Sequence, residues 1–88
     1  MISYVINLIS QAHDKGDMQS AYSFIASSLS DKLNEPYSEK DVIPWRHANS
    51  SPSTEVNAAL FGLLIQCKLN QAGFDSSAST YIASLVTK

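Results

Sequence analysis

The stretch "NEPYSEKDVIPWRHANSSPST", residues 34–54, decides how this chain folds, because it separates two segments with helical periodicity. It contains the only Trp, the only Arg and all three prolines of the 88 residues. Proline favours extended or turn backbone, so we expect an irregular connector over residues 34–51. Within it, "SEKDVI" predicts a single capped turn that ends before Pro44.

Two amphipathic stripes lie on each side of the connector, and each stripe predicts a helix. Gly16 in "HDKGD" predicts a tight turn between the first two helices. Ser51 followed by Pro52 predicts the start of the third helix, and Gly73 its end. The sequence therefore predicts an all-α, four-helix domain. It consists of two antiparallel helical hairpins, residues 2–33 and 52–87, and the connector, residues 34–51.

The two hairpins share a sequence pattern at an offset of 57 residues. "SAYSFIAS" (20–27) aligns with "SASTYIAS" (77–84), and five of the eight residues are identical. Gly16 aligns with Gly73 at the same offset. The pattern predicts a pseudo-symmetric repeat. The alternative is a chance match of Ser and Ala between two amphipathic helices.

Each hairpin also resembles a tetratricopeptide-type unit, in which Gly16, Ala21, Ile25 and Leu29 stand at the characteristic positions. The chain departs from that family at Ala12, where the family has a large aromatic residue. The copies also lie 57 residues apart, whereas the family repeats every ~34 residues. The resemblance implies only an antiparallel helix pair.

The third helix is apolar on most sides, so we expect it to be the central one. Cys67 lies in it and has no second Cys to pair with, which predicts a buried structural thiol. The apolar stripes together predict the following core: Ile6, Ile9, Ile25, Leu29, Leu60, Leu64, Ile82 and Leu85.

Composition limits the function classes. The net charge is −2, and the six basic residues are scattered. Binding to nucleic-acid phosphates needs clustered Lys and Arg, so we do not expect this chain to bind nucleic acid. Charged residues make up only 16% of the chain, so we expect a partner or a second copy to cover part of the surface. The longest apolar run, eight residues from Ala58, is too short for a membrane span. The first residues lack the basic start of a signal peptide, so we expect a cytoplasmic protein.

No pattern in the chain predicts catalysis, a cofactor or a metal. His13, His47 and Cys67 are the only soft ligands, and their spacing fits neither a zinc knuckle nor one helical face. A Cys–His nucleophile is disfavoured because the thiol lies in the most apolar helix, where its pKa rises. We therefore expect a protein that is not an enzyme.

The connector is the predicted partner-binding site. Tyr, Trp and Arg are frequent binding hot spots, and the two central prolines stiffen the segment. The predicted site residues are Glu35, Tyr37, Glu39, Asp41, Trp45 and Arg46. We expect Val42, Ile43 and Trp45 to plug the open end of the hairpins, with Tyr37, Glu39 and Asp41 pointing outward. A plug without any docking role is the alternative.

These features predict a small protein-binding module that inhibits or adapts another protein. Immunity proteins, phage-encoded inhibitors and secretion chaperones are of this type. An acidic, aromatic edge suits a basic toxin or nuclease, which favours an immunity-type inhibitor. A homodimeric nucleic-acid-associated regulator and a small ligand-binding protein are the alternatives.

Overall fold

The computed structural model describes residues 2–14 and 17–86, and it describes no side chain for Asp14 or Val86. These residues form five helices and no strand, so the predicted all-α class is confirmed. The prediction of four helices is wrong, because the connector contains a helix of its own. The helices are α1 (Ile2–Asp14), α2 (Met18–Leu33), α3 (Glu39–Arg46), α4 (Thr54–Gln71) and α5 (Ser76–Val86).

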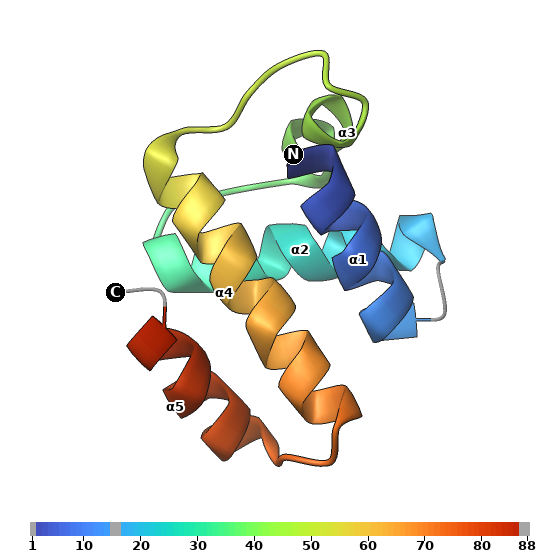
Figure 1. Cartoon of the computed structure of the whole chain (residues 1–88). Coiled ribbons are helices and arrows are strands. Elements are labelled where there is room, and N and C mark those ends of the chain that lie inside the picture. The colour runs from blue at the N-terminus through green and yellow to red at the C-terminus, as the bar shows by residue number, and fades with distance from the viewer. Residues whose placement is uncertain (1, 15–16, 87–88) are drawn as a thin grey trace.

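The helices form two layers (Figure 1). One layer holds α1, α4 and α5, and α2 crosses behind it, with α3 at one end of the molecule. Helix α4 contacts α1, α2 and α5, whereas α3 contacts α1 and α2. Within the described residues α5 contacts α4 alone. Both predicted hairpins therefore bring their helices into contact, but α2 and α5, which the repeat aligns, have different surroundings.

The core lies between α1, α2, α3 and α4. Its fully buried aliphatic side chains are Val5, Ile6, Ile9, Ile25, Leu29, Val42, Leu60 and Leu63. Five of the predicted core residues are confirmed, while Leu64 and Ile82 are only half-buried. Leu85 is 52% exposed, so its assignment to the core is wrong. The main core cluster contains no described α5 side chain, although Ala83 of α5 is itself buried (3% exposed).

Two predicted boundaries in the connector are wrong. Helix α3 continues through Pro44 to Arg46. Proline removes one N–H donor, but the helix is short, and burying Val42 and Trp45 offsets that loss. Helix α4 begins after Ser53, not after Ser51, and the Ser53 hydroxyl accepts a hydrogen bond from the Val56 N–H at 3.3 Å. The serine-rich approach to α4 offers several N-cap candidates, and local sequence does not rank them.

The predicted end of α4 at Gly73 is confirmed. Gly73 has φ of +103°, and its N–H donates to the Asn70 carbonyl. The Phe74 N–H donates to the Leu69 carbonyl, which completes a Schellman motif. The Phe74 ring itself is 48% exposed. The predicted turn at Gly16 lies outside the described residues.

The orientation of α4 gives a matched test. Leu63 is 1% exposed, whereas its neighbour Leu64 is half-buried. Leu63→Ala should lower the free energy of unfolding by ~2–5 kcal/mol because it leaves a cavity. Leu64→Ala should cost clearly less. Urea unfolding of both variants measures the difference, and equal losses would contradict the assigned rotation of α4.

Candidate functional site

The connector forms a turn over residues 34–38 followed by α3, and it closes one end of the core. Val42 is fully buried, and Trp45 is 9% exposed. Ile43, which the sequence placed with them in the plug, is 37% exposed on the opposite side of α3. Trp45 is therefore a packing residue, and most of its ring is out of reach of a partner.

Tyr37 joins the connector to α2. Its backbone N–H donates to the Ser30 hydroxyl at 2.9 Å, and its ring lies 6.4 Å from the Trp45 ring at a tilt of 57°. Its hydroxyl donates to the Glu35 carboxylate at 3.0 Å. Loss of hydration and the Glu35 carboxylate raise the pKa of Tyr37. The side chain is half-buried, so only its outer edge is accessible.

The acidic side chains of α3 also bind within the chain. The Glu39 carboxylate accepts hydrogen bonds from the Gln19 amide, at 3.1 and 3.2 Å, and from the Ser23 hydroxyl. The Asp41 carboxylate accepts from the Ser38 N–H at 2.8 Å, which is half of the capping box that "SEKD" predicts. Glu39 is half-buried, while Asp41 stays exposed.

Arg46 lies at the end of α3 and connects three helices. Its Nε donates to Asn7 Oδ1 of α1 at 3.2 Å, and its Nη1 donates to the Tyr22 hydroxyl of α2 at 3.4 Å. Nη1 also lies 3.5 Å from His47 Nε2. Within the described part of the chain Arg46 has no carboxylate partner. The six predicted site residues thus lie at one end of the molecule, but most of them hold the connector in place.

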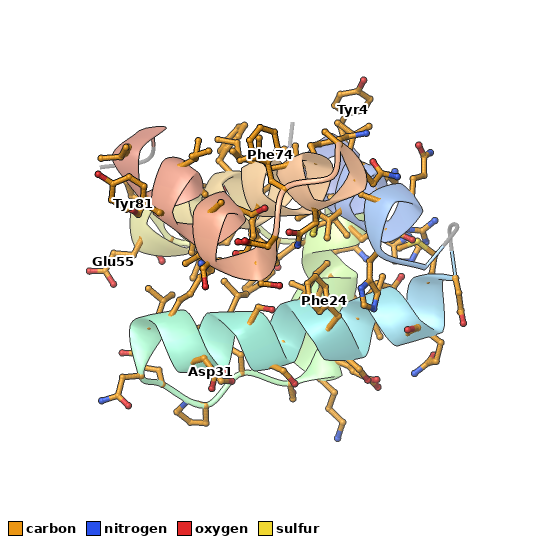
Figure 2. All side chains as sticks on the ribbon, turned by 90° about the horizontal axis from the view of Figure 1, so that it is seen from below. Tyr4, Phe24, Asp31, Glu55, Phe74 and Tyr81 are labelled. Carbon is orange, nitrogen blue, oxygen red and sulfur yellow. The ribbon has the colours of Figure 1, made fainter. Side chains whose placement is uncertain are left out.

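The sequence analysis missed a second surface, on α4 and α5. Large apolar side chains are exposed there: Phe61 (41%), Phe74 (48%), Tyr81 (65%) and Leu85 (52%). We call these four residues the α4–α5 surface. Phe74 projects from the side of the molecule opposite α2, and Tyr81 projects from the edge formed by α5 (Figure 2). The signal was present in the sequence, since α4 has more apolar positions than one core face requires.

A groove of about 340 Å³ runs between the end of α2 and the α4–α5 pair. Small side chains of α4 and α5 line it, among them Ala58, Ala59, Gly62 and Ala83. Lys32 and Glu55 also line it and supply its charges. The groove is large enough to admit a side chain of a partner.

The remaining reactive side chains are used in packing. The His13 ring stacks on the Phe24 ring with centroids 4.0 Å apart. Cys67 is buried, and burial raises the pKa of its thiol, an effect that the Lys32 charge partly opposes. Among the described residues no three His, Cys, Asp or Glu side chains gather where they could hold a metal ion. None of the described helices is long and apolar enough to cross a bilayer.

The buried position of Trp45 predicts a large effect on stability. Trp45→Ala should lower the free energy of unfolding by ~3–5 kcal/mol, because the ring fills the end of the core. Ile43→Ala, on the exposed side of the same helix, is the matched control and should cost much less. Urea unfolding followed by circular dichroism compares the two. A Trp45 emission that is red-shifted and freely quenched in the native protein would contradict the burial.

The thiol gives a test by pH. A raised pKa means that the folded state favours the neutral thiol, so the stability this contributes is present below pH ~8.5 and is lost as pH rises through the folded pKa. Iodoacetamide should therefore alkylate native Cys67 much more slowly at pH 8 than it alkylates the urea-unfolded chain. Mass spectrometry measures both rates. Equal rates would show that the thiol is accessible and ionisable.

Comparison with known proteins identified no relative of this chain. No family model, no curated protein and no solved structure matches the chain. The surfaces described above are consequently the observations from which a function can be argued.

Proposed function

We propose that this chain acts by binding another protein, and that the α4–α5 surface is its main contact. The observation that carries the proposal is the one-sided packing of α5. In the described structure α5 contacts α4 alone, yet it presents Tyr81 and Leu85 to solvent, each more than half exposed. A partner that covers this side would remove that apolar area from water.

The amount of exposed apolar surface supports a binding role. Single apolar residues on a surface are ordinary, but a group of large ones is typical of an interaction site. Helix α5 carries no charged residue along its whole length, Ser76–Val86. A partner can therefore cover it without removing the hydration shell of an ionised group.

The predicted pseudo-repeat supports a helical partner. In stacked helical repeats a hairpin cannot bury its apolar faces alone, and the next hairpin or a polar capping helix completes the burial. Here α4 packs on α1, whereas no described segment packs on the outer side of α5. We expect a helix of the partner to occupy that place. A second copy of the chain could supply the same helix, and sedimentation distinguishes the two cases.

Charge favours a basic partner. Asp31 and Glu35 are exposed, and Asp31 projects from the α2 side of the molecule (Figure 2). The exposed carboxylates of residues 31–41, Asp31, Glu35 and Asp41, outnumber the exposed Lys32 and Lys40, and this excess of negative charge would speed association with a positively charged protein. We therefore retain, as the more specific proposal, an immunity-type inhibitor that neutralises a basic toxin or nuclease.

The experiment is affinity capture from the native host with three forms of the tagged protein. Phe61→Ser with Tyr81→Ser removes two exposed rings of the α4–α5 surface. Ile43→Ser is the matched control, because it removes an exposed apolar side chain from α3. Wild type and control should capture the same protein, identified by mass spectrometry, and the double variant should lose it. Equal melting temperatures of the three forms would show that folding is unaffected.

Glu35→Lys tests the acidic side in the same experiment. It should slow association with a basic partner and leave the dissociation rate nearly unchanged. Capture that survives the double variant but fails with Glu35→Lys would move the binding site to the connector. Capture that is identical for every variant would refute both surfaces.

A further inference from the structure

We propose that a depression between α1 and the end of α3 binds a small monocarboxylate with an apolar body. The depression has a volume of about 370 Å³, within the range of small-molecule sites. Its lining combines polar and apolar side chains from α1, the start of α2 and the end of α3. The lining residues are Tyr4, Asn7, Leu8, Ser10, Gln11, Met18 and Arg46.

The first reason is the set of unused donors on Arg46. The guanidinium carries five N–H donors. Nε donates to Asn7, and Nη1 is directed to Tyr22 and His47, while Nη2 has no partner among the described residues. The three acceptors that hold the guanidinium are neutral oxygens and an imidazole nitrogen. Arg46 is thus fixed in position while its positive charge stays without a carboxylate.

The second reason is an unpartnered hydroxyl in the same depression. Ser10 is 1% exposed, and its Oγ makes no hydrogen bond. A buried hydroxyl without a partner costs free energy, and a ligand oxygen in the depression would satisfy it. Ser10 of α1 and Arg46 of α3 line the same depression, so two different helices supply its donors.

The third reason is the charge of the site. Among the described residues the lining contains no Asp or Glu, and Arg46 is the one permanently charged residue there. One positive charge balances one negative charge, which favours a monocarboxylate over a phosphate dianion. The guanidinium plane also matches the carboxylate plane. Leu8, Met18 and the exposed ring of Tyr4 provide apolar contacts, which favour a ligand with a short hydrocarbon or ring attached to the carboxylate.

This site shares no residue with the α4–α5 surface, so the two proposals can fail separately. The test is a titration of the ¹⁵N-labelled full chain with sodium hexanoate, followed by amide shifts. Hexanamide is the matched probe without charge, and sodium chloride controls for ionic strength. Hexanoate should shift the amides of residues 7–11, the Arg46 amide and the Arg46 Nε–H. Hexanamide should shift them far less.

Three variants connect the binding to the named donors. Arg46→Gln should weaken hexanoate binding by about tenfold or more, because it removes a charge-assisted contact. Ser10→Ala should weaken it by a smaller factor without lowering the melting temperature, since the hydroxyl has no partner to lose. Gln11→Trp should block the depression from the exposed side of α1. Lys68→Gln, which removes an exposed cation of α4 outside the depression, should bind like wild type.

Several results would overturn the proposal. It fails if hexanamide shifts the same amides as strongly as hexanoate, or if the hexanoate shifts are scattered over the surface. It also fails if Ser10→Ala and Gln11→Trp bind hexanoate like wild type. These two variants do not touch the Arg46 contacts, so they decide the matter even if Arg46→Gln fails to fold.

Discussion

The burial of α4 is the constraint on which the rest of the structure depends. This helix is apolar on most of its sides, so it needs neighbours in several directions at once. Helices α1 and α2 cover its most apolar side around Leu60 and Leu63, and α5 covers another. Helix α3 completes the enclosure indirectly, because Val42 and Trp45 fill the space that α1 and α2 leave at one end. Each of these helices therefore lies where it covers an apolar side of α4 or of the α1–α2 pair.

The sequence predicted the helical class and five of eight core positions, because apolar periodicity and the signals of Gly73 and the cap of α3 are local. It placed Leu64 in the core where the structure buries Leu63, since a helix that is apolar on most sides has no single apolar stripe. Leu85 was misplaced for a related reason. Its spacing defines a face of α5, but spacing does not say whether a neighbour exists to cover that face. The predicted helix end before Pro44 was wrong for another reason. An internal proline costs one backbone hydrogen bond, but the free energy gained by burying Trp45 offsets that loss.

The candidate site likewise has features that the local sequence predicts and features that depend on the tertiary fold. Tyr37, Trp45 and Arg46 were predicted as binding residues from their residue types alone. Tyr37 and Arg46, however, also bind partners in α1 and α2, and Asn7, which binds Arg46, lies 39 residues away in the sequence. Serines on α2 make this possible, because Ser23 and Ser30 are short enough to let the connector approach and still supply hydrogen bonds. A local sequence pattern does not predict contacts between residues so far apart in the sequence.

The attachment of α5 has a consequence for the motions of the molecule. Its buried side chains, Ser79 and Ala83, lie outside the main core cluster, and the Ser79 hydroxyl donates a part-buried hydrogen bond to Asn70 Oδ1 of α4 at 2.7 Å. Because α5 contacts α4 alone among the described helices, we expect its amides to exchange with solvent through a local opening that leaves α1 to α4 packed. A partner that binds α5 would also hold it against α4. Part of the binding free energy would then offset the conformational entropy that α5 loses on closing.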